Sequence, residues 1–129
     1  MPDLRTNLIL IVDDDEETCK LIEKTLMLKG YQTATFVNAH EGLAWLESNV
    51  PDLILLDIIM PEIDGGQFLS QIRANEKTRH TSVLFITGLV DGKRTTSWGG
   101  LTDKQTHFLG KPFTSHKLLA SVTALLASN

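Results

Sequence analysis

Short uninterrupted runs of aliphatic residues alternate along this chain with segments of helical periodicity. Runs without a polar position are typical of strands buried on both faces of a parallel sheet. Apolar residues spaced three and four positions apart indicate helices with one buried face. The expected strands are Leu8–Val12, Tyr31–Val37, Asp52–Asp57, Val83–Thr87 and a short one at Phe108–Leu109. The helical stripes are Leu21–Leu28, Leu43–Leu46, Phe68–Ile72 and Leu118–Leu126.

The alternation of strand and helix predicts an α/β fold, a doubly wound parallel sheet with right-handed crossovers. With five strands we expect the flavodoxin-like order 2-1-3-4-5, with helices on both faces. Four glycines and no clean apolar stripe between Gly88 and Thr106 predict a fourth helix that is short or loose. Pro112 is expected at the start of the last helix. The length of 129 residues suits one domain, expected over residues 1–129.

Composition removes several classes of function. The formal net charge is -4 and there is no basic stripe, which argues against direct binding of nucleic acid. A single cysteine, Cys19, excludes an internal disulfide and a cysteine-rich metal site. The polar N-terminus carries no signal peptide, and no apolar run reaches the ~20 residues of a membrane helix. We therefore expect no membrane contact and a cytoplasmic location.

Acidic residues follow two of the expected strands. Asp13, Asp14 and Asp15 come directly after the first strand, and Asp57 ends the third. In the expected strand order these two strands are neighbours, and ligands of such sheets bind outside the carboxyl ends of the strands. Crowded carboxylates repel each other unless a hard cation binds between them. Mg²⁺, which takes oxygen ligands, is the expected cofactor.

Two other strand ends add a hydroxyl and an amine to the same edge. Thr87 ends the fourth strand, and Lys111 follows the fifth. A carboxylate can attack phosphorus and form an aspartyl phosphate, Lys111 can bind a phosphoryl oxygen, and Thr87 can donate a hydrogen bond to another. Each residue alone is more often structural, but their joint occurrence in order makes a purely structural interpretation improbable.

Four strings carry a resemblance to a known family. They are Ile11-Val12-Asp13-Asp14-Asp15, Asp57-Ile58-Ile59-Met60-Pro61-Glu62-Ile63-Asp64-Gly65, Phe85-Ile86-Thr87-Gly88 and Leu109-Gly110-Lys111-Pro112-Phe113. In this order they resemble the receiver domain of two-component response regulators, over nearly the whole chain. Each string alone is a weak signal, whereas the ordered set is highly specific.

The resemblance implies a role for each matching position. Asp57 is the implied phospho-acceptor, and Lys111 contacts the phosphoryl group. The implied magnesium ligands are Asp13, Asp14, Asp57 and the backbone carbonyl of Ile59. Thr87 and Phe108 are the implied switch residues, and the Lys111–Pro112 bond is expected to be cis. Asp15 is an alternative to Asp14, although it is better placed to start the helix.

The resemblance also implies partners. A histidine kinase or a histidine phosphotransfer protein would donate the phosphoryl group, and a downstream protein or a fused domain would sense it. The chain would be a regulatory acceptor that assists its own phosphorylation and dephosphorylation, not an enzyme, and either a monomer or a phosphorylation-dependent dimer. Apolar Ile59 and Leu89, two positions after Asp57 and Thr87, suggest a phosphoryl group shielded from water and therefore long-lived.

Other functions fit these residues less well. A haloacid-dehalogenase-like phosphatase needs a second acid two residues after its nucleophile, where this chain has Ile59. A flavin carrier needs a phosphate-binding loop after the first strand, where this chain has an acidic cluster. A degenerate receiver that only binds proteins, and a receiver domain excised from a hybrid histidine kinase, remain as alternatives.

Overall fold

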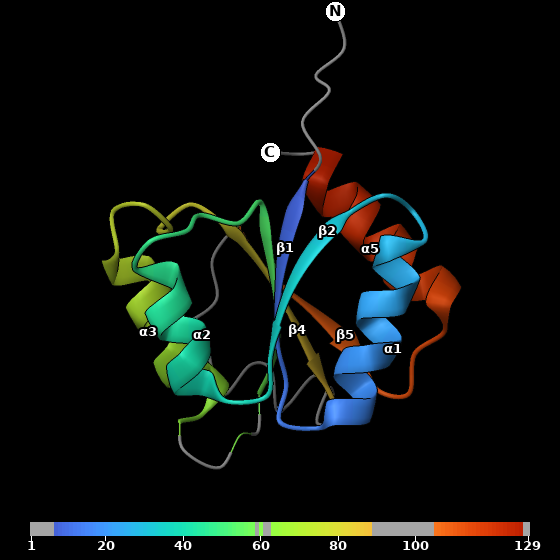
Figure 1. Ribbon diagram of the computed structural model, residues 1–129, viewed down its shortest axis with the longest axis horizontal. Helices are drawn as coiled ribbons and strands as arrows, with labels where there is room; N and C mark the ends of the chain where they lie inside the picture. Colours follow the sequence, from blue (N-terminus) through green and yellow to red (C-terminus); the bar gives the residue numbers. More distant parts are fainter. Residues whose placement is uncertain (1–6, 59, 61–62, 89–104, 128–129) are drawn as a thin grey trace, which may run out of the picture.

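The computed structural model contains a five-stranded parallel sheet in the order β2-β1-β3-β4-β5 (Figure 1). It describes residues 7–58, 60, 63–88 and 105–127. The strands are β1 (Leu8–Val12), β2 (Gln32–Phe36), β3 (Leu53–Asp57), β4 (Ser82–Thr87) and β5 (Thr106–Gly110). The predicted fold class and strand order are confirmed.

Helices cover both faces of the sheet. They are α1 (Glu16–Met27), α2 (Ala39–Leu46), α3 (Gly65–Ala74) and α5 (Ser115–Ala127). α2 and α3 lie on one face, and α1 and α5 lie on the other (Figure 1). The predicted fourth helix falls in residues 89–104, which lie outside the described residues. Within the described ranges, no helix combines the length and apolarity needed to cross a membrane.

The aliphatic runs supply both apolar layers of the core, because successive side chains of a strand point to opposite faces. Leu10 and Val12 of β1 belong to the layer under α2 and α3. Ile9 and Ile11 belong to the layer under α1 and α5. Strand β3 alternates in the same way and is buried throughout. A central parallel strand therefore has no polar position before its last residue.

Side-chain caps fix where the helices begin. Asp15 caps α1, Asn38 caps α2, and Asp64 forms a capping box with Gln67 at α3. The last helix begins at Ser115, three residues later than expected from Pro112. The reason is local: the Thr114 hydroxyl accepts a hydrogen bond from the Lys117 N–H at 3.0 Å, so the first turn is organised by Thr114. The Lys111–Pro112 bond is cis, as expected.

Gly65 allows α3 to lie directly against the sheet. A Cβ at this position would lie 2.8 Å from Cε1 of Phe85 and 2.9 Å from Cα of Ile58. The Gly65 N–H donates to the carbonyl of Ile58 at 2.8 Å, which ties the start of the helix to the residue after β3. The close approach therefore requires a residue without a side chain at the first position of α3.

Gly65→Ala is expected to lower the free energy of unfolding by about 1–3 kcal/mol, because the added methyl group overpacks against backbone that cannot move aside. Gly42→Ala is the matched comparison in α2. Its added Cβ would lie 2.9 Å from the Cγ2 of Val12, a side-chain atom rather than backbone, and farther from Phe68. Urea unfolding of both variants measures the difference. An equal or larger loss for Gly42→Ala would contradict this account of Gly65.

Candidate functional site

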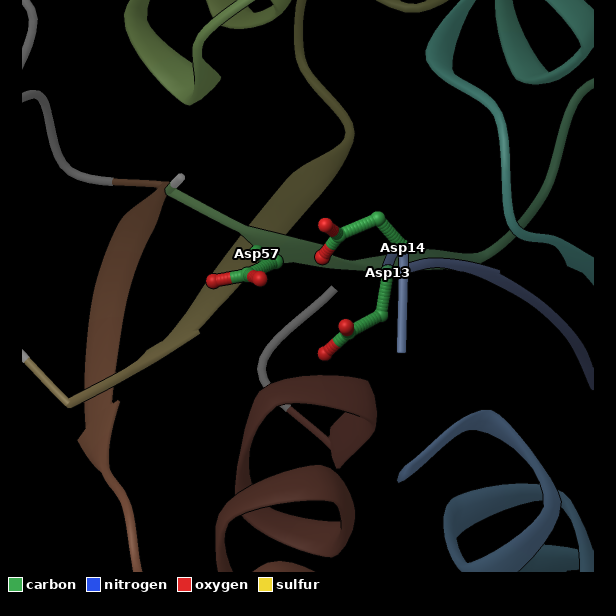
Figure 2. Close-up of side chains that lie close together, drawn as sticks. All are labelled: Asp13, Asp14 and Asp57. Carbon is green, nitrogen blue, oxygen red and sulfur yellow. The ribbon is translucent and has the colours of Figure 1, made fainter. Parts of the chain in front are cut away.

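Three carboxylates gather at the carboxyl ends of β1 and β3. Asp57 is the last residue of β3, and Asp13 and Asp14 follow Val12, whose register partner in β3 is Leu56. Oxygen atoms of Asp13, Asp14 and Asp57 all lie within 4.8 Å of one another (Figure 2). Asp13 and Asp57 are buried, whereas Asp14 is exposed. This is the convergence that the sequence predicted.

Backbone contacts hold Asp13 in place. Its N–H donates to the carbonyl of Phe36 at 3.2 Å, which continues the pairing with β2 past the end of β1. Its Oδ1 accepts from the N–H of Asp15 at 2.9 Å. One carboxylate oxygen is therefore held by the turn that enters α1, and the other, Oδ2, contacts Lys111.

Lys111, just beyond β5, contacts two of the three acids. Its Nζ lies 3.0 Å from Oδ2 of Asp13 and 3.8 Å from Oδ2 of Asp57. Burial by itself lowers the pKa of Lys111, but the hydrogen bond to Asp13 and the charges of Asp13 and Asp57 together raise it above its usual value. The lysine is therefore charged at neutral pH and offsets part of the carboxylate repulsion.

Asp15 has a structural task instead. Its Oδ1 accepts from the N–H of Glu17 at 3.1 Å, and its Oδ2 accepts from the hydroxyl of Thr18 at 2.7 Å. The hydrogen bond from Thr18 is the main cause that lowers the pKa of Asp15. Because these contacts cap α1, the geometry favours Asp14 over Asp15 as the partner of Asp13.

The cluster suits a hard divalent cation, since its donors are all carboxylate oxygens. Repulsion among three acids gives such a cation a favourable electrostatic environment, which Lys111 offsets only in part. Asp13, Asp14 and Asp57 are the described residues that would hold it. The further ligand expected from the sequence, the carbonyl of Ile59, lies outside the described residues.

The backbone of Thr87 lies at the end of β4, beside the strand that ends in Asp57. Strand β4 pairs with β3 through Ile86 and Asp57, and Thr87 itself pairs with Gly110 of β5. The residue is therefore at the expected strand end, between the strands that carry Asp57 and Lys111. Its side chain lies outside the described part of the chain, as does Leu89, so the expected hydroxyl contact and the expected water shielding remain predictions.

The expected switch aromatic, Phe108, lies in β5 and is partly buried against the α2/α3 layer. Its ring stacks on that of Phe85, with ring centroids 5.3 Å apart and an interplanar angle of 25°. The sequence motifs pointed to Phe108 but not to Phe85. A large aromatic residue inside the expected fourth strand, two positions before Thr87, is the signal that could have found it.

The contact of Cys19 with the backbone of Asp13 was also not predicted from the sequence. The buried thiol donates to the backbone carbonyl of Asp13 at 3.1 Å. Burial, and then the charge of Asp13, raise the pKa of the thiol to about 12. A buried thiol with a raised pKa is a poor nucleophile, and the described contact of Cys19 is structural: it holds the end of β1 against α1.

Comparisons with known proteins agree with this geometry. Residues 9–123 match the family model of the response regulator receiver domain. Transcriptional regulatory protein PrrA of Mycobacterium tuberculosis is 36% identical over 118 residues, which cover 92% of this chain and 49% of that protein. Response regulator PleD of Caulobacter vibrioides is 37% identical over 117 residues, covering 91% and 25%. The chain thus spans about half of the first relative and a quarter of the second.

Solved structures show the same fold. Chemotaxis protein CheY4 of Vibrio cholerae superposes with a TM-score of 0.86 at 25% identity, covering 94% of this chain and 99% of that one. The receiver domain of a signal transduction histidine kinase from Syntrophus aciditrophicus gives 0.84 at 28% identity, covering 95% and 92%. Similar domains therefore occur in a chemotaxis protein and in a signal transduction histidine kinase.

The different tasks of Asp14 and Asp15 predict opposite effects of two substitutions. Asp14→Asn is expected to weaken binding of a divalent cation by about tenfold or more without destabilising the fold, because it removes a ligand and a repelling charge. Asp15→Ala is expected to lower the free energy of unfolding, because α1 loses its N-cap, and to leave the cation affinity nearly unchanged. Calorimetric titration with magnesium chloride and urea unfolding measure the two effects. The reverse pattern would show that Asp15 is the ligand.

Proposed function

The chain belongs to the family of response regulator receiver domains, and on this premise we propose that it is a phospho-accepting signalling domain in which Asp57 receives a phosphoryl group in a magnesium-dependent reaction. The observation that carries the proposal is the cluster of three carboxylates within 4.8 Å, with Lys111 on two of them. A purely structural edge of a sheet would have no need for this concentration of charge.

Two side chains of the site, Asp57 and Lys111, act directly in the proposed reaction. An oxygen of the Asp57 carboxylate attacks the phosphorus of a phosphohistidine donor. The P–N bond breaks, the departing imidazole takes up a proton, and an acyl phosphate forms. Bound magnesium would supply positive charge that offsets the phosphoryl oxygens. Lys111, already 3.8 Å from Asp57, donates to a phosphoryl oxygen placed beside that carboxylate.

Phosphorylation then biases a switch. In the proposal the Thr87 hydroxyl binds a phosphoryl oxygen, and the ring of Phe108 moves in response. Support comes from the placement of both residues: Thr87 ends the strand next to Asp57, and Phe108 lies on the neighbouring strand β5. The surface around β5 and α5 would change with them. This is a shift between two states that differ in their affinity for a partner.

The proposed donor is a histidine kinase or a histidine phosphotransfer protein, and the proposed reader is a downstream protein or a fused domain. The protein would work in the cytoplasm as a monomer or as a phosphorylation-dependent dimer. It would not be an enzyme acting on a separate substrate, since it modifies its own Asp57. A similar receiver domain belongs to a signal transduction histidine kinase, so the proposed chemistry would apply equally to a receiver within a hybrid histidine kinase.

Intact-protein mass spectrometry after incubation with acetyl phosphate and magnesium tests the proposal. One phosphoryl adduct is expected, and it should disappear without magnesium and in Asp57→Asn. Asp64→Asn is the matched control, since it makes the same change near the site while asparagine also serves as an N-cap for α3. This variant should be phosphorylated like the wild type.

Two outcomes would count against the proposed function. An adduct that persists in Asp57→Asn would place the acceptor elsewhere. The absence of any adduct in the folded wild-type protein, both with acetyl phosphate and with a phosphorylated histidine kinase, would favour a degenerate receiver that acts only by binding proteins.

A further inference from the structure

We propose that Phe85 is a positioning residue that holds the ring of Phe108 in one rotamer and couples it to the start of α3. The inference rests on the proposed function in one respect, the role of Phe108 as the switch aromatic. Phe85, which is neither the acceptor nor a metal ligand nor a phosphoryl-binding group, would control the rotamer of the Phe108 ring.

One side of the Phe85 ring faces Phe108. The two residues are register partners in the parallel strands β4 and β5, so their side chains leave the sheet on the same face. The rings stack with centroids 5.3 Å apart. Phe85 is completely buried, whereas Phe108 is only partly buried on an edge strand. The fixed ring therefore supports the more exposed one.

A second contact of Phe85 reaches the first residue of α3, close to the end of β3. Its Cε1 lies only 2.8 Å from the place where a Cβ of Gly65 would be, so the ring edge touches the first residue of α3. Gly65 in turn donates its N–H to the carbonyl of Ile58, directly after Asp57. The contacts thus run from the backbone beside Asp57 through Gly65 and Phe85 to Phe108.

Phe108 depends on this support more than a tyrosine would. It has no hydroxyl group, so no hydrogen bond of its own side chain can hold the ring in either position. An aromatic pair adds stabilisation beyond burial that corresponds to about a two- to tenfold change in a two-state population. Such a factor is enough to change the fraction of molecules in which the Phe108 ring adopts its minor rotamer before phosphorylation.

Rotamer measurements on Phe108 test the proposal. The three-bond couplings from its ring Cγ to the backbone nitrogen and carbonyl carbon report χ1, and the loss of a neighbouring ring current does not alter them. In Phe85→Leu these couplings should become averaged, with at least a twofold rise in the minor rotamer before phosphorylation. Val83→Ala is the matched control: it shortens a fully buried side chain in the same apolar layer and strand, but Val83 pairs with Thr106. Its Phe108 couplings should equal those of the wild type.

Phe85→Met, which keeps an unbranched apolar side chain, serves if the leucine variant does not fold. In the wild type itself, cross-relaxation between ring protons of Phe85 and Phe108 is expected. Unchanged couplings in the folded leucine or methionine variant, an equal change in Val83→Ala, or no cross-relaxation would each overturn the proposal. None of these readouts needs phosphorylation, so they separate its failure from a failure of Asp57 to accept a phosphoryl group.

Discussion

Repulsion among three carboxylates at one edge of the sheet is the constraint on which the rest of this structure depends. Parallel pairing of β1 with β3 brings Asp13, Asp14 and Asp57 within 4.8 Å. Two of the three are buried, where charge is costly without compensation. The surrounding residues can be understood by how they compensate this charge or hold it in place.

Compensation and support come from different parts of the chain. Lys111, which is distant in sequence, contacts Asp13 and Asp57 from the end of β5. The Asp15 N–H and the Cys19 thiol donate to the carboxylate and the carbonyl of Asp13 respectively. Lys111 supplies one positive charge to three acids, and the remaining excess of negative charge is what a divalent cation would offset. The same edge thus unites the proposed metal site, the proposed phosphoryl acceptor and the start of the proposed switch.

The sequence predicted those features that depend on strand pattern and order. The apolar runs before Asp13 and Asp57 implied parallel strands, and the order 2-1-3-4-5 implied that their ends meet; both are confirmed. The sequence also favoured Asp14 over Asp15, because Asp15 is better placed to start α1, and the capping hydrogen bonds of Asp15 agree with that choice. The path from Gly65 through Phe85 to Phe108 depends on tertiary packing between three elements, which no local periodicity encodes. The later start of α5 follows from the Thr114 cap rather than from Pro112.

Three carboxylates at this site repel one another until a cation binds. The free energies of unfolding of the wild type and of Asp57→Asn, each measured with and without magnesium, test this account most directly. Without magnesium, Asp57→Asn should be the more stable protein, by on the order of 1 kcal/mol, because one repelling charge is gone. Magnesium should stabilise the wild type more than the variant, and so reduce this difference. A less stable variant, together with a wild type whose stability does not respond to magnesium, would contradict the account.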